Sequence, residues 1–162
     1  RVRSSAASDV YKRQRLESST PGVYAAGDIC EYESVLHGGT SLRLEHWDVA
    51  FNHGKTAALN MLGRDVPHED VPYFYSVLGD WGELEYVGPA YQWDEEVLRG
   101  SLEEGSFTQW YLQNGVVKAA LTFGRSEDLD HARRLLREEV VLEKRHRQAL
   151  ADVDSDLATV GS

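Results

Sequence analysis

The hydrophobic pattern divides the chain into a helical region, a linker and a region of alternating strands. Trp47 to Leu62 carries small apolar residues at helical spacing, and Gly63 follows as a residue suited to end a helix. Residues 107–113 and 116–123 alternate as strands and flank Asn114-Gly115, the strongest short hairpin signal. The pattern therefore predicts one helix in the first half and an antiparallel sheet in the second.

Weaker patterns complete the expected elements. Gly22 to Ala26 reads as a short strand of small residues, residues 29–42 as a loop, and Glu83 to Gly88 as a further strand. Ser126 starts a second helix. The buried stripe of the first helix is expected to be Ala50, Gly54, Ala57 and Met61. The buried stripe of the second is expected to be Leu129, Ala132, Leu135 and Leu136.

Composition excludes several classes of protein. The net charge is −10 with a pI near 5.0, which argues against nucleic-acid binding because phosphates need a basic face. Cys30 is the single cysteine, so the chain carries no internal disulfide and no redox dithiol. No apolar run is long enough to span a bilayer. We expect a cytoplasmic protein without membrane contact and, because its histidines are scattered, without a metal site.

The residues alone indicate one ligand site. Gly27 lets the backbone turn tightly after the small-residue strand, and Asp28 then stands at the carboxyl end of that strand. Open α/β sheets hold their ligands at such ends, and a carboxylate there can accept hydrogen bonds from sugar-like hydroxyls. Each such bond contributes about 0.5–1.5 kcal/mol. This argument gives a site but no ligand.

A family resemblance supplies the ligand. Residues 20–28, T-P-G-V-Y-A-A-G-D, resemble the second flavin-binding motif of two-dinucleotide-domain flavoprotein reductases. Residues 44–50 and 57–63 resemble the helix that follows this motif, and residues 72–76, P-Y-F-Y-S, resemble the entry to the C-terminal domain. The chain is most similar to ferredoxin, rubredoxin and dioxygenase-component reductases, with apoptosis-inducing-factor-like proteins as relatives.

The resemblance implies an FAD-dependent oxidoreductase that takes a hydride from NAD(P)H and passes electrons to a ferredoxin- or rubredoxin-type carrier. It implies that Asp28 holds the ribityl chain of FAD and that the start of the following helix points at the flavin ring. No residue of this chain is assigned a catalytic role. The residues that the resemblance places at the cofactor are Gly27, Asp28, His46, Trp47 and Tyr75.

The resemblance also implies a domain organisation for an α+β chain. Residues 1–14 resemble a translated library adapter and are expected to be a disordered, non-native leader. Residues 15–65 would be the tail of an FAD/NAD(P)-binding α/β domain. Residues 66–150 would be a small C-terminal reductase domain with an antiparallel sheet and helices, able to cover the flavin or form a homodimer contact. Residues 151–162 are expected to fray.

The sequence contains no G-x-G-x-x-G loop, so it lacks the sites for the pyrophosphate and adenine of FAD. We therefore expect the chain alone to bind flavin weakly or not at all, to be inactive, and to belong to a longer protein. Two alternatives stay open: a non-catalytic dimerisation or binding module with a remnant flavin motif, and an NADH oxidase or disulfide reductase of the same superfamily.

Overall fold

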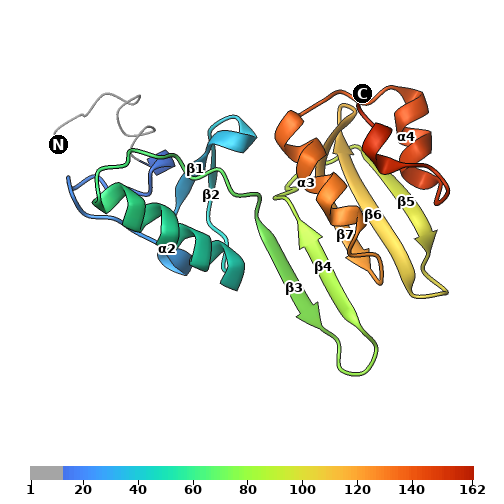
Figure 1. Ribbon diagram of the computed structural model, residues 1–162, viewed down its shortest axis with the longest axis horizontal. Coiled ribbons are helices and arrows are strands. Elements are labelled where there is room, and N and C mark those ends of the chain that lie inside the picture. Colours follow the sequence, from blue (N-terminus) through green and yellow to red (C-terminus); the bar gives the residue numbers. More distant parts are fainter. Residues whose placement is uncertain (1–12) are drawn as a thin grey trace. The chain divides into compact units, whose positions relative to one another are not determined.

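The computed structural model describes residues 13–162, which form two compact units (Figure 1). The first unit ends at Pro72 and the second begins at Tyr73. The sequence places this boundary earlier, after Asp65. The later division has a physical reason, because the His68 N–H donates to the carbonyl of Gln14 at 2.8 Å and so ties the linker to the first unit.

Most of the predicted leader, residues 1–12, lies outside the described residues. Its last two residues are part of the first unit. The Arg13 guanidinium pairs with the Glu33 carboxylate, with 2.9 Å between Nη2 and Oε1. The Gln14 carbonyl accepts the hydrogen bond from His68. These two residues are therefore better counted with the folded chain than with a leader.

The first unit contains more regular structure than the sequence predicts. Residues 29–42, expected to be a loop, form a small hairpin with a helical turn between its strands. Gly22 to Ala26 forms no strand and makes only an isolated bridge between Tyr24 and Glu17. The elements are η1 (Gly27–Ile29), β1 (Tyr32–Ser34), η2 (Val35–His37), β2 (Thr40–Leu42) and α2 (Trp47–Met61).

Helix α2 has nearly the predicted bounds, and Gly63 ends it with a φ of +75°. The predicted buried stripe is wrong, because only Ala57 of its four residues is buried and Met61 is 62% exposed. The buried positions are Val49, His53, Thr56, Ala57 and Asn60. Three of these are polar, which a search for apolar periodicity overlooks.

Asn60 shows why a polar residue occupies the buried side of α2. Its Nδ2 donates to the carbonyls of Arg15 (2.9 Å) and Val66 (2.8 Å), and its Oδ1 accepts from the Val66 N–H at 2.7 Å. The amide therefore holds the segments before η1 and after α2 together. The apolar core beside it consists of Leu16, Cys30, Tyr32, Leu42 and Ala57.

The second unit is built on a five-stranded antiparallel sheet of order β3-β4-β7-β6-β5. Its strands are β3 (Tyr73–Val77), β4 (Glu83–Val87), β5 (Glu95–Ser101), β6 (Ser106–Gln113) and β7 (Val116–Phe123). The Asn114-Gly115 hairpin is confirmed, with both residues at positive φ, +50° and +77°. Strands β3 and β5 were not predicted as strands.

Helices cover one face of this sheet (Figure 1). Helix α3 (Asp128–Glu138) packs on β7 and β4, and helix α4 (Lys144–Ala151) packs on β5. The predicted stripe of α3 is confirmed, since all four of its residues are at most 2% exposed. The α+β class expected from the sequence is therefore correct. No helix within residues 13–162 has both the length and the apolar character needed to cross a membrane.

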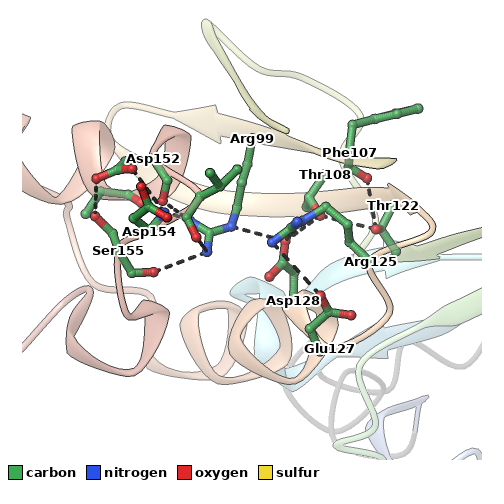
Figure 2. Close-up of polar contacts among 12 residues, drawn as sticks. Arg99, Phe107, Thr108, Thr122, Arg125, Glu127, Asp128, Asp152, Asp154 and Ser155 are labelled. Carbon is green, nitrogen blue, oxygen red and sulfur yellow. Dashed lines mark hydrogen bonds and ion pairs between the residues drawn. The ribbon is translucent and has the colours of Figure 1, made fainter. Parts of the chain in front are cut away.

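The C-terminal residues, expected to fray, pack against the second unit. They form η3 (Leu157–Thr159), and both Leu157 and Val160 are buried. Arg134 donates to the carbonyls of these two residues at 3.1 and 2.7 Å. Arg99, on β5, reaches other carbonyls of the same segment (Figure 2). The segment is held because its backbone carbonyls accept from the buried Arg99 and the half-buried Arg134, and its acidic sequence does not indicate these contacts.

Candidate functional site

The turn at Gly27 joins the first motif to helix α2. Gly27 is buried and has a φ of +77°, a conformation that favours glycine. Its N–H donates to His53 Nδ1 at 3.3 Å. A Cβ built at this position would lie 3.4 Å from the Cβ of Ala50, so the turn also lies close against α2. The tight turn expected from the sequence is therefore present.

Asp28 follows this turn and is exposed. Its backbone carbonyl accepts from Arg43 Nε at 2.8 Å. In the part of the chain that the structure describes, the Asp28 carboxylate forms no hydrogen bond or ion pair. Its negative charge acts to raise the pKa of His46, although burial of the imidazole is the larger effect and lowers that pKa overall. The carboxylate is thus close to the start of α2 and open to a ligand.

The N-terminus of α2 is the second part of the site. His46 is the N-cap, its backbone is extended, and it makes no side-chain capping bond to the helix. The first N–H groups of a helix have no acceptor within the helix, so they can bind a partially negative group. Asp48 does not take this place, because its Oδ2 accepts from Asn52 Nδ2 at 3.1 Å, one turn along the helix.

Trp47 gives this end of the helix an aromatic surface. Its side chain is 74% exposed and stacks on Phe51, with 5.4 Å between ring centroids and an interplanar angle of 8°. Lys55 Nζ lies 4.5 Å from the centroid of the Phe51 ring. Phe51 was not singled out from the sequence, although aromatic residues four apart on a helix are expected to meet.

Of the five residues assigned to the cofactor, four lie together in the first unit, where η1 contacts α2: Gly27, Asp28, His46 and Trp47. Tyr75 lies on β3 of the second unit, is 56% exposed, and stacks on Tyr73 with 6.4 Å between ring centroids. The Tyr73 hydroxyl donates to Glu85 at 2.8 Å. Phe74, on the same strand, packs against Tyr86.

A buried ring cluster beside Gly27 was missed by sequence reasoning. His53 lies 4.7 Å from Tyr32 and 4.5 Å from His68 between ring centroids, and both pairs are close to perpendicular. Burial lowers the pKa of each histidine to about 4, so both are neutral near pH 7. Thr56 Oγ1 lies 3.1 Å from His68 Nδ1. The one residue that could have led to this cluster is His53, which lies on the side of α2 that contacts the Gly27-Asp28 turn.

Other ligand sites have little support. Within residues 13–162 no three or more histidine, cysteine, aspartate or glutamate side chains gather as metal ligands. A cavity of about 370 Å³ is lined by residues from the 13–31 segment, among them Leu16, Ala25 and Cys30. Asp28, His46 and Trp47 do not line this cavity. The open surface at the start of α2 therefore stays the better candidate, because the Asp28 carboxylate and the first N–H groups of the helix lie there and can bind a ligand.

Comparison with known proteins relates both units to reductases. A family model described as "Reductase C-terminal" matches residues 74–161, more than half of the chain. The 5,5'-dehydrodivanillate O-demethylase ferredoxin reductase subunit of Sphingobium sp. is 34% identical over 140 residues, covering 86% of this chain and 33% of that protein.

Solved structures extend the likeness to the fold. The ferredoxin reductase of the CYP199A2 system from Rhodopseudomonas palustris matches with a TM-score of 0.79 and 28% identity, over 92% of this chain and 36% of that chain. The covalent putidaredoxin reductase–putidaredoxin complex matches with a TM-score of 0.78 and 25% identity, over 91% and 34% respectively. The chain spans about a third or less of the length of the curated relatives it matches.

Proposed function

The chain belongs to the Reductase C-terminal family, and from this premise we propose that it is part of a longer FAD-dependent NAD(P)H oxidoreductase. In this proposal the first unit is the tail of the flavin domain and the second is the C-terminal reductase domain. The observation that carries the proposal is the pairing, in one unit, of an open Asp28 carboxylate with the uncapped start of α2.

The residues at the start of α2 fit one end of FAD. An exposed carboxylate after a glycine turn suits the hydroxyls of a ribityl chain, and the first-turn N–H groups suit the electron-rich edge of a flavin ring. The sequence has no glycine-rich loop for the pyrophosphate and adenine. The remainder of the FAD site would therefore lie in other parts of the longer protein.

The chemistry that FAD would supply when bound is hydride acceptance from NAD(P)H and release of the electrons one at a time. The contribution of this chain would be binding and orientation. Asp28 would accept hydrogen bonds from ribityl hydroxyls, and the dipole of α2 would stabilise negative charge on the ring by about 1–2 kcal/mol. Trp47 would pack beside the ring, stacked as it is on Phe51. Tyr75 and the rest of β3 would belong to the covering domain.

The electron acceptor would be a small iron–sulfur carrier of the ferredoxin type. One similar structure is a reductase in covalent complex with putidaredoxin, and the Sphingobium relative is named as a ferredoxin reductase subunit. The proposal also covers a rubredoxin-type carrier as the acceptor and a homodimer contact. It includes a cytoplasmic location, because a sequence with a single cysteine fits a reducing compartment.

The proposal is tested by the flavin content of the longer protein. We expect a bound-flavin absorbance spectrum and turnover that is faster with ferredoxin than with oxygen or a disulfide. The Asp28→Ala variant should lose two hydrogen bonds to the cofactor, about 1–3 kcal/mol, and weaken FAD binding about 5- to 150-fold without unfolding. The matched control is Asp130→Ala, which removes an exposed carboxylate on α3.

Each outcome decides a separate part of the proposal. A colourless longer protein would favour the binding-module alternative and reject the flavin assignment. Faster turnover with a disulfide would reject the carrier-reductase branch. Equal flavin content in Asp28→Ala and wild type would reject the role of this carboxylate while leaving the family assignment intact.

A further inference from the structure

His53 is a buried, neutral side chain that touches the Gly27 turn. It lies on α2 two helical turns after His46, and its exposed fraction is 0%. Its Nδ1 is 3.3 Å from the backbone nitrogen of Gly27. This contact joins the middle of α2 to the turn that presents Asp28, 26 positions earlier in the sequence.

The contact fixes the protonation of the imidazole. A backbone N–H can only donate, so Nδ1 of His53 must carry the lone pair and the ring proton must be on Nε2. Nε2 is buried and has no hydrogen-bond partner among residues 13–162. Burial lowers the pKa of His53, the electrostatic interaction with His68 lowers it further as the two rings titrate, and Asp70 raises it. The neutral form that the contact requires is therefore the stable one.

Neighbouring rings hold this imidazole in place. Tyr32, on β1, and His68, in the segment after α2, each meet the His53 ring nearly edge-to-face, at interplanar angles of 82° and 80°. Edge-to-face packing fixes the ring orientation as well as its position. The acceptor is thus preorganised by two segments that do not themselves touch the Gly27 N–H.

We infer that His53 is a positioning residue for the flavin site, which holds the Gly27-Asp28 turn by accepting the Gly27 N–H. Gly27 is buried, so its N–H has no water to bond if the acceptor is removed. The turn would then be free to rearrange, and the Asp28 carboxylate would leave its place beside the start of α2. The effect on flavin rests on the proposed function, whereas the hydrogen bond itself does not.

Two substitutions separate the hydrogen bond from the packing. His53→Leu keeps a side chain of similar size but has no acceptor. His53→Asn places an Oδ1 near the position of Nδ1 but leaves space where the outer ring atoms were. We expect His53→Asn to fold less stably than His53→Leu and yet to bind FAD more tightly. A merely structural role would give the same order in both measurements.

The first measurement uses the 162-residue chain without flavin. We expect hydrogen exchange at the Gly27 amide to be about 3- to 10-fold faster in His53→Leu than in wild type and close to wild type in His53→Asn. The Gly27 amide shift should titrate with a midpoint near pH 4 in wild type, as His53 protonates and Nδ1 becomes a donor, and this titration should be lost in His53→Asn. Equal exchange in all three proteins would overturn the inference.

The second measurement uses FAD and the longer flavoprotein. We expect the dissociation constant for FAD to rise about 3- to 10-fold in His53→Leu and less than 2-fold in His53→Asn. Asn60→Ala is the control, because it destabilises the first unit by removing the hydrogen bonds to Arg15 and Val66 and lies outside both the ring cluster and the Gly27 turn, and its affinity should stay at the wild-type value. If binding in Asn60→Ala were weakened as much as in His53→Leu, the effect would be general destabilisation and the inference would be overturned.

The two arms also separate this inference from the function on which it rests. A wild-type longer protein without flavin would reject the proposed function, and the Gly27 exchange rates would still decide whether His53 holds the turn. A flavin-bound wild type with unchanged affinity in His53→Leu would leave the proposed function standing and reject the positioning role.

Discussion

Replacing Arg99 with methionine should destabilise the second unit strongly, because this one side chain holds the end of the chain (Figure 2). Arg99 is 4% exposed. Its Nη1 donates to the carbonyls of Ala149 and Asp152. Its Nη2 donates to the carbonyls of Val153 and Ser155 at 3.2 and 3.1 Å. Methionine fills part of the volume and can bond none of these four groups.

The same substitution removes a charge from a buried cluster. Arg99 Nε is 3.4 Å from Asp128 Oδ2, and Asp128 is 3% exposed. The carboxylate keeps two donors, Thr108 Oγ1 at 2.7 Å and Arg125 Nε at 3.0 Å. Breaking a buried ion pair by removing one partner costs about 3–5 kcal/mol. We expect a loss in this range, because the carbonyls left without donors add to the cost while Arg125 reduces it.

Urea unfolding measures the loss, with Trp110, fully buried in the second unit, as the fluorescent reporter. With a slope of about 1–3 kcal/mol per molar urea, the midpoint should fall by at least about 1 M. Arg145→Met is the control, since the Arg145 side chain is 70% exposed in its pair with Glu143, and it should stay within about 0.5 kcal/mol of wild type. An Arg99→Met protein within 1 kcal/mol of wild type would refute the reasoning.

Two further predictions concern the first unit. His53 and His68 have pKa values near 4 in the folded protein against an ordinary 6.5, so the unfolded chain binds protons first as the pH falls. The stability that this difference contributes should be complete above pH 6.5 and fall by about 3 kcal/mol per histidine towards pH 4. Urea midpoints measured across this pH window would show the loss. Burial raises the pKa of the Cys30 thiol from 9.0 to about 11, which lowers the fraction of reactive thiolate at pH 8. Iodoacetamide should therefore alkylate the native protein at least about 100-fold more slowly than the urea-unfolded chain at this pH. Equal alkylation rates would contradict the burial of Cys30.

The elements predicted best from the sequence are those whose signal lies in a few neighbouring residues. The Asn114-Gly115 hairpin, helix α2 with Gly63 at its end, and the apolar stripe of α3 each follow from side-chain periodicity or from a residue suited to positive φ. Strand β5 was missed because its sequence, E-E-V-L-R-G-S, does not alternate between polar and apolar residues. The segment is a strand because it pairs with β6, and this pairing depends on the whole sheet and not on the sequence of β5 alone.

The candidate site was predicted in part for a similar reason. Gly27 and Asp28 stood out because a glycine turn before a carboxylate is a local feature. His53 did not, because its role depends on a backbone N–H far from it in the sequence and on two rings from other segments. Buried polar residues such as Asn60 share this property: their partners are set by the fold, so apolar periodicity places them on the wrong side of the helix.

The anchoring of the C-terminal segment sets an order on biosynthesis. The carbonyls that accept from Arg99 and Arg134 lie 23 to 56 positions later in the sequence, and they bring Leu157 and Val160 into the core. The first unit ends at Pro72 and contains none of these contacts. The second unit can close its core only after residues 149–160 have been synthesised, so nascent chains stalled before residue 150 would expose that core to chaperones and proteases.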